Sequence, residues 1–247
     1  MADRIVDVNP EITGRIKIAE RKCAVMNAFL PPVMEIESGL PPYIKEWISA
    51  KRKNGMMVVS SNAYRLETYK GEDLYGLDLC IEAARRAISN QFQLCFIFIV
   101  SVLDDYKDTF YRYGEIIRES GLQDNFLLIN ENLSFVRLME QSDIVLRPTN
   151  TDGDSLTVRE ALYLGKVVIA SDVVNRPAGT ILFRSRDIDD LADKLMEAVT
   201  KKDFRHKQAQ PEIIIKTFYT ELVDKTFVRY QSGADDLVGI CKVESNS

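Results

Sequence analysis

The sequence has few of the residues that metal centres and disulfide scaffolds require. Its 247 residues include a single histidine, His206, and four cysteines with no Cys-x-x-Cys pair. Cys80 and Cys95 lie inside apolar segments, so we expect them to be reduced core residues. A histidine-rich metal site is therefore excluded, and His206 is interpreted as an ordinary surface residue. A metal role for the acid pair Asp104–Asp105 remains a minor alternative.

The chain also lacks the basic excess and the long apolar runs of other protein classes. Its 32 Lys and Arg against 37 Asp and Glu give a net charge of −5, whereas a nucleic-acid binder needs a basic face to displace counterions. No apolar run approaches the ~18 residues of a membrane span. The first residues, MADRIVDVNPEITG, do not have the layout of a signal peptide. These absences favour a cytoplasmic protein.

Three common signatures of nucleotide and ester chemistry are missing as well. The sequence contains no G-x-x-x-x-G-K-[ST], no G-x-G-x-x-G and no G-x-S-x-G. A P-loop hydrolase, a dinucleotide-dependent oxidoreductase and an α/β-hydrolase therefore lack their anchoring motifs.

What is present is a regular alternation of short apolar runs and amphipathic segments. The pattern predicts strands at 56–61, 94–100, 125–130, 143–148 and 166–171, and helices at 76–90, 108–121, 134–142, 155–165 and 188–200. Strands that alternate with helices form right-handed parallel crossovers. The sequence therefore predicts the α/β class, with a doubly wound parallel sheet.

Polar loops follow three of the predicted strands. They read SSNAYRLETYKGED after the first strand, NENLS after the third and RPTNTDGDS after the fourth. In doubly wound sheets ligands bind beyond the carboxyl ends of the strands, where the strand order reverses. The loops are therefore expected to share a ligand site.

The loop at 152–160 has the features of a site for a phosphorylated polyol. Because the predicted helix begins near Ser155, its free N–H groups and positive dipole end suit a phosphate, and Gly153 lets backbone approach a ligand closely. Asp152 could accept hydrogen bonds from a neutral polyol, and Glu160 could chelate a vicinal diol such as a ribose. The alternative is simple capping, with Asp154 or Ser155 as the N-cap and Glu160 solvated.

Two cations lie in the loop after the first predicted strand. Arg65 offers a planar fork and Lys70 a point charge, and together they could clamp a pyrophosphate. The alternative is a solvated loop in which both cations pair with the acids Glu67, Glu72 and Asp73.

These motifs resemble those of a known enzyme family. Asp152-x7-Glu160, continuing as EALYLGKVVIASD, is similar to the E-x7-E signature of the group 1 retaining glycosyltransferases, which have the GT-B fold. The phrase RPTNTDGDSLTVREALYLGKVVIASDVVNRPAG resembles a subgroup associated with bacterial surface polysaccharides. Arg65 and Lys70 match the family's phosphate-binding Arg and Lys, and AVMNAFLPP resembles the connector between its two Rossmann-like domains. The resemblance covers roughly residues 22 to 200.

The resemblance implies a role for each matching residue. Arg65 and Lys70 would bind the donor diphosphate, and Asp152 would contact the donor sugar; these three form the expected catalytic set. Glu160 would bind the ribose, and Asn130 would lie near the base. The backbone that would hold sugar and phosphate comprises Gly153, Asp154, Ser155, Leu156 and Thr157.

The loop after the fourth predicted strand, with the first turn of the helix that follows it (residues 149–157, the donor loop), departs from the family pattern at several positions. Asp152 replaces the usual first Glu, Asp154 and Ser155 replace Phe and Gly, and Thr157 stands where Pro is common. The shorter reach of Asp152 is expected to affect the choice of sugar. No cofactor or metal is expected, because fixed cations would neutralise the diphosphate of the nucleotide sugar.

The resemblance also implies a domain organisation. Residues 1–22 are interpreted as a remnant of a preceding acceptor domain, 23–54 as an interdomain connector, 55–205 as the nucleotide-sugar-binding domain and 206–247 as a C-terminal helix and tail. The chain is therefore expected to be the donor-binding half of a GT-B enzyme. It is expected to need a missing N-terminal domain or a partner chain and to be catalytically incomplete by itself.

The expected function is transfer of a sugar from a nucleotide diphosphate sugar to a saccharide or lipid-linked acceptor, with retention, in cell-surface polysaccharide synthesis. At most a peripheral contact with the inner face of the membrane is expected. One alternative is a non-catalytic nucleotide-sugar-binding module or subunit. A remoter one is an epimerase of nucleotide sugars, which would need a general acid/base and a complete second domain.

Overall fold

The computed structural model describes residues 5–7, 23–25 and 29–201, which fall into two compact units. The first unit, Met1–Leu30 with Gln210–Ser247, contains the described strands β1 (Ile5–Asp7) and β2 (Cys23–Val25), which pair in parallel. The second unit, Pro31–Ala209, contains all other described elements. The C-terminal helix and tail predicted at 206–247, with His206, lie outside the described residues.

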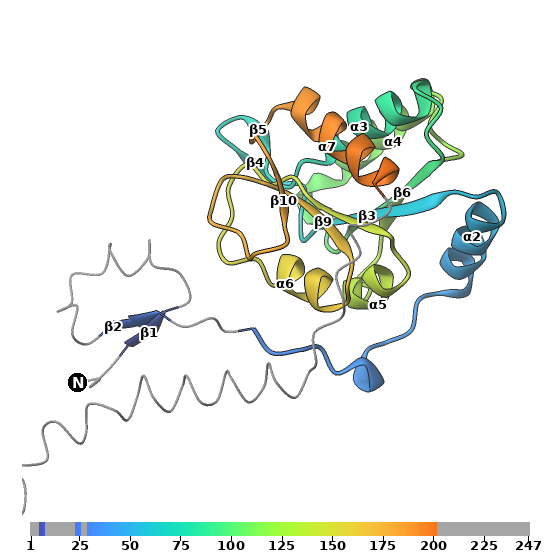
Figure 1. Ribbon diagram of the computed structural model, residues 1–247. Coiled ribbons are helices and arrows are strands. Elements are labelled where there is room, and N and C mark those ends of the chain that lie inside the picture. Colours follow the sequence, from blue (N-terminus) through green and yellow to red (C-terminus); the bar gives the residue numbers. More distant parts are fainter. Residues whose placement is uncertain (1–4, 8–22, 26–28, 202–247) are drawn as a thin grey trace, which may run out of the picture. The chain divides into compact units, whose positions relative to one another are not determined.

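A six-stranded parallel sheet forms the centre of the second unit (Figure 1). Its strand order is β10-β9-β8-β3-β6-β7, so β3, the first strand of this sheet along the chain, lies between the sheet's second strand, β6, and its fourth, β8. The strands are β3 (Met57–Ala63), β6 (Leu94–Val100), β7 (Phe126–Asn130), β8 (Ile144–Arg147), β9 (Val167–Ser171) and β10 (Ile181–Phe183). The predicted doubly wound α/β fold is confirmed, and the strand order reverses at β3.

Helices cover both faces of the sheet, as Figure 1 shows. One layer consists of α3 (Leu77–Ser89), α4 (Lys107–Glu119) and α7 (Ile188–Thr200), and the other of α2 (Pro42–Lys53), α5 (Phe135–Glu140) and α6 (Leu156–Tyr163). No described helix is long and apolar enough to span a membrane.

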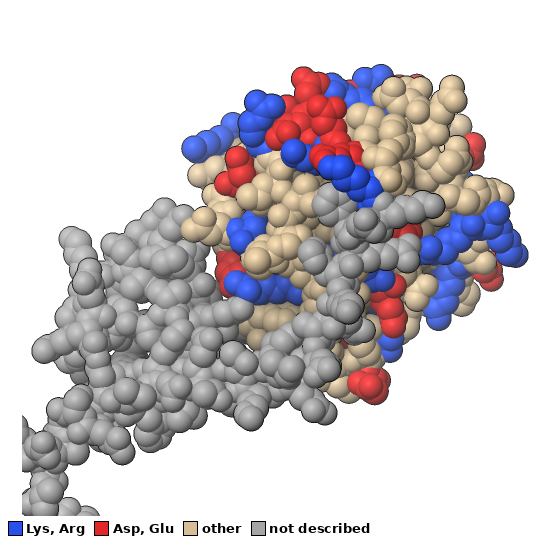
Figure 2. All heavy atoms as spheres, viewed as in Figure 1, with Lys and Arg blue, Asp and Glu red and all other residues tan. Residues whose placement is uncertain are grey.

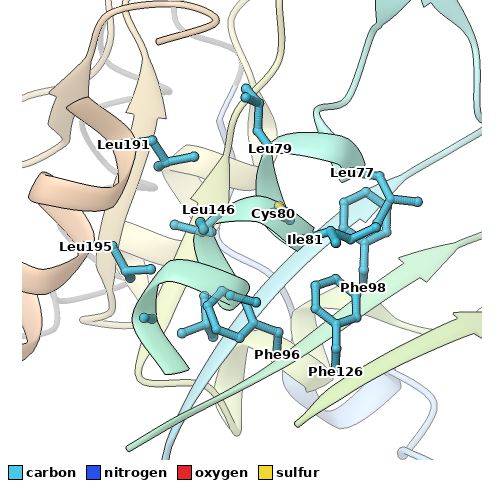
Figure 3. Close-up of a cluster of buried hydrophobic side chains, with 14 of the residues drawn as sticks. Leu77, Leu79, Cys80, Ile81, Phe96, Phe98, Phe126, Leu146, Leu191 and Leu195 are labelled. Carbon is cyan, nitrogen blue, oxygen red and sulfur yellow. The ribbon is translucent and has the colours of Figure 1, made fainter. Parts of the chain in front are cut away.

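Strand β6 shows why the central strands are apolar throughout. All seven of its residues are buried, and successive side chains of a strand point to opposite faces. Phe96 and Phe98 therefore join the core under α3, α4 and α7, whereas Cys95 and Ile97 pack toward α2. Figure 3 shows the first of these cores, in which the rings of Phe96 and Phe126 stack with centroids 5.8 Å apart.

Cys80 and Cys95 are free and buried, as expected for reduced core residues. Burial raises the pKa of the Cys95 thiol to about 12. Because the thiolate is the reactive form of cysteine, this thiol is inert at neutral pH.

Local signals in the sequence set several helix ends. Ser134 precedes α5, and its hydroxyl accepts a hydrogen bond from the Arg137 N–H at 3.2 Å, as an N-cap does. Gly121 and Gly165 follow α4 and α6 with φ of 68° and 70°, the left-handed conformation that ends a helix. These predictions are confirmed.

Helix α2 lies within the segment that the sequence assigns to a connector. Its buried Ile44 and Ile48 pack against the β3 and β6 side chains Val58 and Ile97, so this part of the segment is a layer of the sheet domain. Basic side chains gather over the helix in Figure 2, and its last turn contains Lys51, Arg52 and Lys53. The predicted limits of the connector stay predictions.

Several short elements were not predicted, among them β2. Others are the 3-10 turns η2 (Met34–Ile36) and η3 (Asp104–Tyr106), the hairpin of β4 (Thr68–Tyr69) with β5 (Glu72–Asp73), and the edge strand β10.

Candidate functional site

The loops that follow β3 and β8 meet at the carboxyl edge of the sheet, where the strand order reverses. Asn150, in the loop after β8, donates from its backbone N–H to the Leu74 carbonyl at 3.1 Å. Its side-chain Nδ2 donates to the Tyr69 carbonyl, also at 3.1 Å, and so reaches the hairpin that carries Lys70. The structure therefore brings these two polar loops together, as the sequence predicts.

The amino end of α6 has no side-chain cap. Ser155 occupies the N-cap position without a cap hydrogen bond, and the Asp154 carboxylate instead accepts from Arg159 Nε at 2.7 Å. In the described part of the chain, no group accepts from the N–H groups of residues 155–158. Ser155 thus occupies the predicted N-cap position, but neither it nor Asp154 caps the helix through its side chain, and the free donors leave the helix end suited to an anion.

Glu160, in the second turn of α6, is partly buried and lacks donors. None of the described residues gives its carboxylate a hydrogen bond or an ion pair. Burial, and then the nearby Glu37, raise the pKa of Glu160; the Glu37 carboxylate itself accepts from the Ser134 hydroxyl at 2.6 Å. Glu160 is thus not the solvated residue of the capping alternative. It is an acceptor placed where a ligand could supply donors.

The carboxylate of Asp152 has many protein partners. Arg147 binds it with two nitrogens, at 3.0 and 3.2 Å, and Arg176 Nη1 donates to it at 2.9 Å. Thr149 Oγ1 and the Gly153 N–H add contacts of 3.2 and 3.0 Å. Burial opposes ionisation, but the two arginines outweigh it and lower the pKa of Asp152. The predicted contact of Asp152 with a sugar stays a prediction, and any such sugar would compete with these donors.

Arg65 and Lys70 project from the loop after β3 without the predicted loop acids as partners. Arg65 pairs with Asp104 at 3.4 Å and lies 5.1 Å from the centroid of the Tyr64 ring, while its Nε is buried with no acceptor. Lys70 sits at the turn of the β4–β5 hairpin with φ of 55°, and its Nζ lies 5.3 Å from the Tyr69 ring. The alternative in which both cations pair with loop acids is wrong; their joint diphosphate clamp stays a prediction.

The loop acids bind other partners. Glu72 pairs with Arg186 at 3.3 Å. The Asp73 carboxylate accepts from the Tyr75 and Gly76 N–H groups, both at 2.9 Å, at the start of α3. These contacts engage Glu72 and Asp73 away from the two cations, while Arg65 keeps its exposed pair with Asp104.

Asn130 ends β7 at the same edge of the sheet. Its Nδ2 donates to the Val100 carbonyl at 2.9 Å, which ties the ends of β7 and β6 together. The next residue, Glu131, accepts from the Tyr43 hydroxyl at 2.6 Å. The predicted proximity of Asn130 to a nucleotide base stays a prediction.

Sequence reasoning missed four residues that organise the site: Arg147, Thr149, Asn150 and Arg176. Arg176 is the least obvious, because it lies 24 residues beyond Asp152 and its side chain is only 2% exposed. A buried arginine needs a carboxylate partner, but no sequence pattern shows that Arg176 is buried.

Replacing Asn150 with alanine should loosen the hairpin that carries Lys70. The change removes the side-chain hydrogen bond to the Tyr69 carbonyl, so we expect unfolding to become about 1 kcal/mol easier. Amides of residues 69–72 should exchange faster by hydrogen-exchange mass spectrometry. Asn90→Ala is the control, because Asn90 makes a similar bond to the Arg86 carbonyl at the end of α3. Unchanged exchange at 69–72 would contradict the assignment.

Comparison with known families identifies the class of protein. Residues 44–211 match the family described as glycosyl transferases group 1. The match covers more than half of the chain, so the chain belongs to this transferase family. A search of curated protein sequences found no match.

Solved structures support the same fold. A glycosyltransferase from Rickettsia africae superposes with a TM-score of 0.68 at 15% identity, covering 96% of this chain and 64% of that one. Anabaena Alr3699/HepE in complex with UDP and glucose gives 0.63 at 14% identity, with 94% and 64% covered. Sucrose-phosphate synthase from Thermosynechococcus elongatus gives 0.63 at 12% identity, with 96% and 59% covered. The chain thus spans less than two thirds of the length of these neighbours.

Proposed function

We propose that this protein binds a nucleotide diphosphate sugar and transfers its sugar, with retention, to a saccharide or lipid-linked acceptor in cell-surface polysaccharide synthesis. The observation that carries the proposal is the uncapped amino end of α6, which follows the loop whose Asn150 is bonded to the Lys70 hairpin, within a chain of the group 1 family. One solved neighbour was captured with UDP and glucose.

In this proposal the protein acts by electrostatic stabilisation. The departing diphosphate gains negative charge as the bond to the sugar breaks, and preorganised donors lower the energy of that state. The free N–H groups at residues 155–158 would face the diphosphate together with Arg65 and Lys70. Glu160 would accept hydrogen bonds from the ribose hydroxyls, and fixed cations would take the place of a metal.

The acceptor would be held by a further domain or a partner chain. The neighbouring structures are longer than this chain, and a second wall is needed to exclude water and to orient an acceptor. The acceptor and the domain or partner chain that would hold it are part of the proposal, as is the peripheral contact with a membrane.

Replacing Arg65 with alanine tests the diphosphate site. The loss of a charge-assisted hydrogen bond should weaken binding of a nucleoside diphosphate by about 1.5–3 kcal/mol, measured by calorimetry with UDP, GDP and ADP. The stability should hardly change, because the pair with Asp104 is 37% and 56% exposed and such surface pairs contribute little.

Arg118→Ala is the matched control for that experiment. Arg118 forms an exposed pair with Glu115 on α4 at 3.7 Å, away from the carboxyl-edge loops. Its replacement should leave nucleotide affinity unchanged. If Arg65→Ala binds every nucleoside diphosphate as tightly as the parent does, the assignment of the diphosphate site is wrong.

A further inference from the structure

The Asp152 carboxylate is saturated by protein donors. Arg147 Nε, Arg176 Nη1 and Thr149 Oγ1 approach Oδ2, and Arg147 Nη2 and the Gly153 N–H approach Oδ1, all within 3.2 Å. An ionised carboxylate has about four lone-pair sites. No acceptor capacity is left for the hydroxyl of a sugar unless one of these contacts breaks.

The two arginines join Asp152 to the ends of neighbouring strands. Arg147 is the last residue of β8, and its guanidinium lies 5.3 Å from the centroid of the Tyr75 ring, in the segment that leads into α3. Arg176 donates to the carbonyl of Ser171, the last residue of β9, at 3.1 Å. Asp152 is therefore the point at which β8, β9 and the donor loop are connected.

Thr149 and Ser171 close this cluster. The Ser171 hydroxyl donates to the Thr149 carbonyl at 2.6 Å, and Arg176 Nη2 lies 3.3 Å from Thr149 Oγ1. Thr149 and Ser171 are 1% exposed or less. Because a charge-assisted network in a nearly dry site permits few other arrangements, it holds the loop in one conformation.

We propose that Asp152 is a positioning residue that fixes the donor loop, and that it does not bind the sugar. Its Oδ1 turns the Gly153 N–H back toward residue 152, just before the uncapped start of α6. The arginine pair would hold this turn so that the N–H groups of residues 155–158 face the diphosphate. The inference rests on the proposed function and assigns sugar selection to groups other than Asp152.

The Asp152→Asn variant separates this role from sugar binding. UDP, GDP and ADP are titrated first, and then the glucose conjugate of the tightest of them, with parent and variant. A positioning residue acts through the loop, so the variant should bind the nucleotide and its glucose conjugate more weakly by the same factor. A tenfold rise in both dissociation constants corresponds to about 1.4 kcal/mol. If Asp152 instead bound the sugar, only the affinity for the glucose conjugate would fall in the variant, and that result would overturn the proposal.

Arg147→Lys provides a second test in case Asp152→Asn folds poorly. Lysine keeps the charge but cannot form the two-nitrogen fork, so both ligands should weaken alike. If Asp152 instead bound sugar and the fork were immaterial, this variant would leave both affinities unchanged, which would also overturn the proposal.

Asp143→Asn is the matched control. The Asp143 carboxylate bridges Arg52, at 3.2 Å, and the Val58 N–H, at 2.8 Å, next to the start of β8. Its replacement should lower stability while leaving both affinities as they are in the parent.

Hydrogen exchange without ligand keeps this inference independent of the proposed function. The loop amides that are hydrogen-bonded in the parent, those of Asn150 and Gly153, should exchange faster in Asp152→Asn, and unchanged exchange at both would refute the positioning role. If the parent binds no nucleoside diphosphate, the proposed function fails, whereas the exchange measurement still decides whether Asp152 fixes the loop.

Discussion

Replacing Gly76 with alanine is expected to destabilise the protein by about 3 kcal/mol or more, from left-handed strain together with overpacking. Gly76 precedes α3 with φ of 72°, which favours glycine. A Cβ atom here would overlap with the Pro148 carbonyl oxygen and would lie 2.8 Å from Pro148 Cγ. Since Pro148 directly follows β8, either the start of α3 or the donor loop would have to move. Urea unfolding of the variant gives the free energy.

Two other glycines separate the clash from the backbone strain. Gly55 and Gly121 have φ of 76° and 68°, and nothing lies within 4 Å of a Cβ built on either. Alanine at these positions should cost only the left-handed penalty, about 1 kcal/mol. Equal losses in all three variants would mean that the contact with Pro148 does not constrain the site.

The fold was predictable where apolar periodicity runs over several residues. The seven buried residues of β6 and the amphipathic stretch of α7 begin and end where the sequence indicates. Strand β10 has three residues and an exposed Leu182, and the strands of the hairpin have two residues each. Such short segments contain too few repeats of the two-residue strand period to stand out in the sequence, so their pairing depends on tertiary contacts.

The position of the site was predictable, but its internal contacts were not. The polar loops after the first and fourth predicted strands indicated the carboxyl edge of the sheet, and the structure adds that the strand order reverses at β3, which places these two loops together. The choice of Asp154 between capping α6 and pairing with Arg159 is decided by side-chain geometry. The pairing of Asp152 with Arg176 depends on the path of the chain after β9, which carries no periodic signal.

Replacing Glu160 with glutamine is expected to weaken nucleotide binding without unfolding the protein. A carboxylate that accepts ribose hydroxyls forms charged hydrogen bonds, so its neutral analogue should lose about 1.5–3 kcal/mol of affinity for a nucleoside diphosphate. Inorganic pyrophosphate, which has no ribose, should bind parent and variant alike. Glu46→Gln, at an exposed position on α2, is the control. Equal nucleotide affinity in parent and Glu160→Gln would show that the ribose lies elsewhere.

The pH dependence of stability provides an independent test of Glu160. Burial and then Glu37 raise its pKa above the ordinary 4.5, so the folded state prefers the protonated carboxyl. The stability that protonated Glu160 gives to the folded state is fully present below pH 4.5, and it is lost as the pH rises through the pKa of Glu160 in the folded protein. Relative to Glu160→Gln, the parent should therefore become less stable across that window, as thermal melts at successive pH values would show.

Nucleotide binding should depend on pH in the opposite direction. Ribose hydroxyls donate more strongly to the ionised carboxylate, which accepts at both oxygens, so the ligand should favour deprotonation of Glu160, and affinity should fall as the pH drops through its pKa. The Glu160→Gln variant should lack this component, which calorimetry at several pH values measures directly. The same desolvation that makes Glu160 costly to the free protein thus leaves its oxygens unpaired for a ligand. A parent whose affinity has the same pH profile as the variant would rule out Glu160 as the group that binds the ribose.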